Sequence, residues 1–239
     1  MFAIHSACLA LPSAHLIPFR QGPGLLQHNL WHLLSPHWTT GSQQSDFLDA
    51  LSDHIGGQPD LVDRFCVKGL ALSLKIIEAA ATRDTNLYKT AWTFEWIWKL
   101  GDNIALHKQG VLTLHNLGEN NQHWVALVVD SEAKVILYRN LFGTDIPPKL
   151  LEAYQWWLLQ HTSSSLAHGI LPITFQEPHD TSSCGFLSHN SLEHFAFPGT
   201  VLLIATSGIR AARMKAFLSI AEQVLEQVSP WRYDWRTAY

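Results

Sequence analysis

Three short β-rich runs in the middle of the chain constrain its fold more than any other feature. They are rich in Val, Ile, Leu and aromatic residues, and turn residues separate them, which is typical of adjacent strands in one buried sheet. The runs are 111–115 (VLTLH), 123–130 (HWVALVVD) and 134–140 (KVILYRN). Apolar residues at helical spacing precede and follow them, so helices are expected to cover the sheet. The sequence therefore predicts an α+β domain.

The segments outside these runs are predicted mainly as helices. The expected helices are 45–55 (capped by Ser45 and ended by Gly56 and Gly57), 70–81, 85–100, one opened by Pro147 and Pro148, one starting near Ser183, and about 209–228; a further strand is expected at 170–175. Residues 1–44 contain four prolines and are predicted to be loop-rich and to lie on the surface of the core. Residues 45–239 show no dividing linker and are predicted to form one domain.

Composition excludes several classes of function. Of the 239 residues, 47% are hydrophobic and 15% are charged, which is sufficient for one large core. The 16 Lys and Arg do not exceed the 20 Asp and Glu, so a general nucleic-acid binder is excluded. No apolar run approaches the roughly 18 to 20 residues of a membrane-spanning helix. The three cysteines, Cys8, Cys66 and Cys184, lack metal-finger spacing, so we expect neither a disulfide scaffold nor a structural zinc site. We therefore expect a reducing intracellular compartment.

Cys184 is the first candidate for chemistry. It lies where the polar loop HDTSS meets an apolar helical pattern, with Ser182 or Ser183 as the cap. A thiol in the first turn of a helix feels the positive end of the helix dipole, which is expected to lower its pKa and supply a nucleophilic thiolate. Gly185 would let the backbone approach a substrate carbonyl, so the Cys184 amide could form part of an oxyanion hole. The alternative is that Cys184 is a small buried hydrophobic residue.

His123 and Asn140 are the candidates for the base and the residue that orients it. His123 begins one predicted strand and Asn140 ends the next. If the two strands pair as an antiparallel hairpin, their outer ends meet at one edge of the sheet. The histidine would then take the thiol proton and the asparagine would hold the imidazole, as in a Cys-His-Asn triad. Asp145 is the alternative orienting residue, although it lies past the strand.

The motifs VLTLHN, HWVALVVD, VILYRN, ITFQ and SSCGFLSHNSLEHF, in this order, resemble the ubiquitin-like-protein-specific cysteine protease family (Ulp/SENP type), including its diverged fungal members. The resemblance covers about residues 110–197. It implies a papain-like fold with a short central sheet flanked by helices, in which 45–239 is the catalytic domain. It also implies a thiol hydrolase that needs no cofactor and cleaves after the C-terminal Gly-Gly of a ubiquitin-like protein such as SUMO or ubiquitin. That protein and its conjugates would be the partners.

Carried over residue by residue, the resemblance implies His123 as the general base, Cys184 as the nucleophile and Gln176 as an oxyanion-hole donor. Trp124 would form the lid over the narrow tunnel that holds the Gly-Gly tail. Trp38 resembles the second wall of that tunnel, and core packing is an equal alternative for it. Two features depart from the family pattern: Asn140 stands where the family has an aspartate, and the loop between Gln176 and Cys184 is about two residues longer.

Other interpretations stay open at the level of sequence. A weakened or inactive member could bind a ubiquitin-like protein without cleaving it, and an acetyltransferase could use the same thiol fold. Three histidines near Cys184 do not form a metal-ligand pattern, so no metal is expected; they are His179, His189 and His194. The resemblance leaves the nucleus and the cytoplasm as expected locations.

Overall fold

A mixed five-stranded sheet forms the centre of the structure. The computed structural model describes residues 16–19, 22–26, 33–34, 37–107, 109–118, 123–162, 165–177 and 179–228. The strands, in sheet order, are β3 (Phe65–Val67), β4 (Gly110–Asn116), β5 (Trp124–Asp130), β6 (Val135–Arg139) and β7 (Ala167–Ile170). The three central strands pair antiparallel, and each edge strand pairs parallel to its neighbour. The predicted central sheet is thus confirmed.

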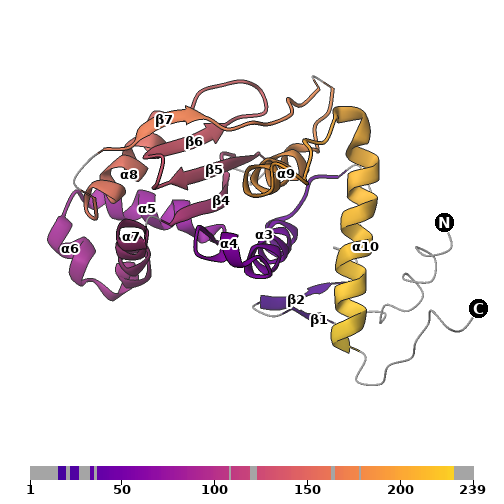
Figure 1. Ribbon diagram of the computed structural model, residues 1–239, viewed down its shortest axis with the longest axis horizontal. Helices are drawn as coiled ribbons and strands as arrows, with labels where there is room; N and C mark the ends of the chain where they lie inside the picture. The colour runs from indigo at the N-terminus through magenta and orange to yellow at the C-terminus, as the bar shows by residue number, and fades with distance from the viewer. Residues whose placement is uncertain are drawn as a thin grey trace, which may run out of the picture.

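Helices cover both faces of this sheet (Figure 1). One face carries α5 (Ala71–Thr82), α6 (Thr85–Thr90), α7 (Glu95–His107) and α8 (Pro148–Leu159). The other face carries α3 (Gly41–Gly56) and α9 (Cys184–Ala196). Every residue of β5 is buried, because successive side chains alternate between the two faces and both faces are covered. The expected α+β architecture, a sheet flanked by helices, is therefore present.

The last helix, α10 (Ile209–Val228), stands beside this body (Figure 1). Its first turns lie near α9, and farther along it lies next to a hairpin of β1 (Leu16–Phe19) and β2 (Gly22–Leu26). Three short elements complete the described chain: α4 (Pro59–Val62) and the 3-10 turns at Trp92–Phe94 and Thr206–Gly208. No helix among the described residues combines the length and the apolar content needed to cross a bilayer.

The N-terminal prediction was wrong in two places. Strands β1 and β2 lie inside the segment that was expected to hold only loops. Helix α3 begins at Gly41 rather than Ser45, because Thr40 and Gln43 form a reciprocal capping box: the Gln43 N–H donates to Thr40 Oγ1, and the Thr40 N–H donates to Gln43 Oε1. The signal for this box, a Thr followed three residues later by Gln, is present in the sequence.

Two other predicted elements were also misplaced. The single helix expected at 85–100 is broken, since α6 ends at Thr90 and α7 starts at Glu95. The strand expected at 170–175 lies at 167–170, where it pairs with β6 up to Tyr138. Leu171 still donates its N–H to the Tyr138 carbonyl at 3.2 Å, but β6 ends at Arg139 and Pro172 has no N–H to donate, so the strand does not continue to 175.

Candidate active site

His123 and Asn140 meet at one end of the central hairpin. His123 directly precedes β5, and Asn140 directly follows β6. The antiparallel register pairs Ala126 with Arg139, which brings the two outer ends together. The His123 ring nitrogen Nε2 lies 3.0 Å from Asn140 Oδ1. The contact predicted from the hairpin is therefore present, and the alternative, Asp145, is exposed to solvent in the following loop.

The hydrogen bonds of Asn140 determine the tautomer of His123. The backbone N–H of Phe142 donates to Asn140 Oδ1 at 3.0 Å, so this atom must be the amide oxygen, an acceptor. His123 Nε2 must then carry the hydrogen that it donates to the same oxygen. In the neutral ring the other nitrogen, Nδ1, keeps a lone pair and can accept a proton.

Phe142 also fixes the orientation of the imidazole. Its ring stacks on that of His123, with centroids 4.8 Å apart and planes 14° apart. The Phe142 side chain is 59% exposed, so it contributes little to the core. Sequence analysis did not identify Phe142, although its place two residues after Asn140 put it within reach of the histidine.

Cys184 is the first residue of α9 and packs against the start of β5. The N–H groups of Trp124, Gly185 and Cys184 itself face the sulfur. Ser188, one turn along α9, donates its hydroxyl to the Trp124 carbonyl at 2.9 Å. Helix α9 thus contacts both main-chain polar groups of Trp124, its N–H through Cys184 and its carbonyl through Ser188. Because Trp124 directly follows His123, these contacts place the thiol beside the end of the hairpin.

Burial, however, raises the pKa of the Cys184 thiol above its ordinary value. The side chain is fully buried, and the loss of hydration outweighs the N–H groups of Trp124 and Gly185, which favour the thiolate. The nearby Asp180 carboxylate raises the pKa further. The expectation of a lowered thiol pKa was therefore wrong for this closed site. The thiol keeps its proton at neutral pH, and a base must remove it during reaction.

Gln176 fixes the loop that leads to Cys184. It is buried, and its Nε2 donates to the Asp180 carbonyl at 2.5 Å. The Asp180 carboxylate in turn accepts the N–H groups of Ser182 and Ser183 at 2.9 and 3.1 Å. Although burial acts to raise the pKa of Asp180, these hydrogen bonds hold it below its ordinary value. The longer loop thus engages the Gln176 amide with Asp180, through both the Asp180 carbonyl and its carboxylate.

The segment 37–40 lies across the start of α9 and is held there by several elements. Trp124 donates its indole N–H to the Thr39 carbonyl at 3.1 Å, and its ring is buried in the core between the sheet and α9. Trp38 is half-buried against the same core. The two tryptophans that the resemblance assigned to a tunnel are therefore both near the thiol, in a closed, packed arrangement.

Gly185 is needed for close packing in this structure. A Cβ atom there would lie 2.0 Å from Thr39 Oγ1 and 2.1 Å from Gln44 Nε2. These two atoms are hydrogen-bonded to each other at 2.6 Å and are buried. The close backbone approach that Gly185 permits is therefore an approach to α3 and to segment 37–40.

Arg213 of α10 is a site residue that sequence analysis missed. Its side chain is 5% exposed, with Nη1 donating to the His37 carbonyl and Nη2 to the Ser182 carbonyl. A signal was available, because Arg213 lies four residues after Ile209 and four before Phe217 and so falls on the buried stripe of the helix.

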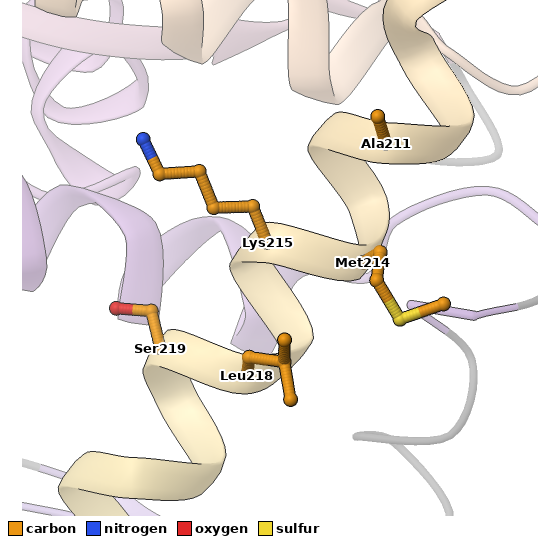
Figure 2. A pocket seen from close by; sticks show the side chains of 5 residues that line it. All are labelled: Ala211, Met214, Lys215, Leu218 and Ser219. Carbon is orange, nitrogen blue, oxygen red and sulfur yellow. The ribbon is translucent and has the colours of Figure 1, made fainter. Parts of the chain in front are cut away.

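Other features of the described residues lie outside this site. A depression of about 480 Å³ opens on the surface of α10 (Figure 2) and is lined by Ala211, Met214, Lys215, Leu218 and Ser219. The described part of the chain contains no cluster of three His, Cys, Asp or Glu side chains placed to hold a metal ion.

Comparison with known proteins identifies the fold. The chain matches the catalytic domain of the Chaetomium thermophilum Ulp1-like SUMO protease with a TM-score of 0.66 and 12% identity, over 92% of this chain and 87% of that one. It matches the SUMO protease Ulp1 with an oxidised catalytic cysteine with a TM-score of 0.65 and 15% identity, over 93% and 95%. The Ulp1 protease domain in complex with Smt3, the yeast ortholog of SUMO, gives 0.63 and 16%, over 94% of each chain. No family model and no curated protein matched the sequence. The chain therefore has the fold of the Ulp1-type SUMO proteases.

Proposed function

We propose that the chain is a cysteine protease that cleaves after the C-terminal Gly-Gly of a ubiquitin-like protein, inside the cell. The observation that carries this proposal is the hydrogen bond between His123 and Asn140, which leaves Nδ1 of the imidazole as a base. The residue after His123 contacts Cys184 at the start of α9. The shared fold with Ulp1-type SUMO proteases supports the same assignment, and one of those proteins is bound to Smt3.

The proposed reaction proceeds through a thioester. His123 Nδ1 accepts the proton of Cys184 while the sulfur attacks the carbonyl carbon of the last glycine. The N–H groups in the first turn of α9 stabilise the negative oxygen that forms, and Gln176 adds a donor when its amide turns away from Asp180. The imidazolium then gives its proton to the leaving amine, and a water activated by the same ring hydrolyses the thioester. Asn140 holds the ring in one tautomer throughout.

The tryptophans give this site its preference for glycine. Trp124 contacts Cys184 and Trp38 packs against the core that contains Cys184, and flat indole rings exclude residues with larger side chains than glycine. Because Cys184 is fully buried, the tail of a substrate must displace part of segment 37–40 to reach it. The Gly-Gly tail is narrow and flexible enough to enter with a small displacement.

A second candidate function is binding without cleavage. The burial of Cys184, its raised pKa and the amide at Asn140 in place of a carboxylate all reduce nucleophile activation. A chain of this kind would bind a ubiquitin-like protein through the same surface and release it unchanged.

Covalent probes distinguish the two functions. SUMO and ubiquitin carrying a C-terminal vinyl sulfone should label the folded chain at Cys184, and Cys184→Ala and His123→Ala should abolish labelling. Cys66→Ala is the matched control, because this thiol lies in β3 and its pKa is raised by burial to about 11. Binding of a probe in a pull-down without a covalent adduct would support the binding module. Neither binding nor labelling by either probe would contradict both functions.

A further inference from the structure

Arg213 is a buried cation whose role the reaction above does not use. It lies in the first turns of α10, where that helix passes α9 (Figure 1). A guanidinium that is only 5% exposed is unfavourable unless its N–H groups find acceptors. Two of them donate to main-chain carbonyls, those of His37 at 3.0 Å and Ser182 at 2.9 Å.

The contacts of Arg213 lie on both sides of the nucleophile. Ser182 is two residues before Cys184, and Phe186 is two residues after it. The guanidinium carbon lies 4.7 Å from the centroid of the Phe186 ring, a cation–π distance. The bond to His37 adds the start of segment 37–40. One planar group thus fixes the loop before the thiol, the helix after it and the segment that crosses both.

The charge of Arg213 is also coupled to that of the thiol. Burial lowers the pKa of the guanidinium, while the negative charges of Asp180 and of ionised Cys184 act to raise it. Because the attraction between two charges is mutual, the guanidinium is placed to favour the ionised form of the sulfur, an effect smaller than the burial, the N–H groups and the Asp180 charge that set the thiol pKa. Asp180 opposes this effect at the sulfur, and it faces the same site from the loop before α9.

We propose that Arg213 is a positioning residue that holds the Cys184 loop in place and stabilises the thiolate when the proton leaves the sulfur. The catalytic meaning of this inference rests on the proposed protease function. The effect on the sulfur does not, because it can be measured without any substrate.

The test is the pH dependence of alkylation of Cys184 by iodoacetamide, followed by peptide mass spectrometry on the full chain. Arg213→Met removes the charge and the two hydrogen bonds to His37 and Ser182, and should raise the apparent pKa of the thiol about as much as a tenfold loss of thiolate at pH 7.5 requires. The readout is the pH midpoint of alkylation rather than its absolute rate, because loss of the bond to His37 also eases access to the thiol. Arg213→Lys keeps a charge without the planar fork, and should restore more than half of this shift. Cys66 provides an internal reference in every sample, since it is remote in sequence from Arg213 and lies in β3.

Two control variants separate this effect from general loss of structure. Arg210→Met removes an exposed cation from the same helix, and Ile220→Ala removes a buried side chain from it; neither should change the pH profile of Cys184. The inference is overturned if Arg213→Met leaves the profile unchanged or if Ile220→Ala shifts it equally. If Arg213→Met shifts the alkylation profile but is labelled by the vinyl sulfone probes as fast as the wild type, the effect of Arg213 on the thiol is supported. Thiolate formation is then not the step that limits the rate of probe labelling. A shifted profile in a chain that no ubiquitin-like probe labels would support Arg213 and count against the protease function.

Discussion

Replacing Gly185 with alanine is expected to destabilise the fold although alanine is the better helix former. The added carbon would lie 2.0 Å from Thr39 Oγ1 and 2.1 Å from Gln44 Nε2, whereas ordinary contact begins at about 3.4 Å. Overpacking of this kind costs about 1–3 kcal/mol. Displacing the two polar atoms also breaks their 2.6 Å hydrogen bond and leaves buried groups unpaired, which costs about 1–3 kcal/mol more. Helix propensity returns about 1 kcal/mol, so a net loss of about 1–5 kcal/mol is expected.

Urea unfolding followed by tryptophan fluorescence measures this loss, since the chain contains 10 tryptophans. Gly56→Ala is the matched control, because Gly56 ends helix α3 and a Cβ there meets nothing within 4 Å. That variant should be neutral or up to about 1 kcal/mol more stable. If Gly185→Ala unfolds at the same urea concentration as the wild type, the packing argument for Gly185 is wrong. Its place would then be explained by approach to a substrate, as the sequence alone indicated.

Three further changes test the site and the core. Asn140→Asp should speed probe labelling at neutral pH about tenfold, because a carboxylate stabilises imidazolium by charge; a rate no higher than that of wild type would contradict this. Phe142→Leu should slow labelling about three- to tenfold and change the free energy of unfolding by less than about 1 kcal/mol, since only the stacking on His123 is lost; an equal loss in Phe142→Tyr would argue against stacking. Burial raises the pKa of Asp46 from 3.8 to about 7, and the charge of Asp49 is the second cause. The free energy of unfolding should therefore fall as pH rises from about 4 to 7, because the unfolded chain loses this proton first. Asp46→Asn should therefore add about 4 kcal/mol at pH 8 and little at pH 4 in chemical denaturation, and identical pH dependence in both proteins would refute this assignment.

The part of the site that sequence could predict is the part that a single hairpin builds. His123 and Asn140 lie at the outer ends of two strands that are adjacent in the chain, so alternation and a short turn suffice to bring them together. The position of Cys184 at the start of a helix was also readable, because a polar loop and an apolar period meet there. These features depend on local pattern and on one nearest-neighbour pairing.

The parts that sequence could not predict depend on contacts between distant segments. The pKa of Cys184 follows from how completely other elements cover it, and helix position alone gave the opposite direction. The short strand β3 is recognisable only through its parallel pairing with β4, which starts more than 40 residues later. Arg213 reaches His37 across 176 positions of the chain, a separation at which periodicity carries no information about the partner.

Contacts between distant segments also determine the free energy needed to expose the Cys184 thiol to a substrate. Segment 37–40 is held by donors from three elements: Trp124 of β5, Gln44 of α3 and Arg213 of α10. At about 1 kcal/mol net for each hydrogen bond, releasing all three costs about 3 kcal/mol, which corresponds to an open population of about 1%. The apparent affinity for a substrate that needs the open state is reduced by the same factor. Contacts made by the folded body of a ubiquitin-like protein, rather than by its two terminal glycines alone, must therefore supply the binding energy that opens the site.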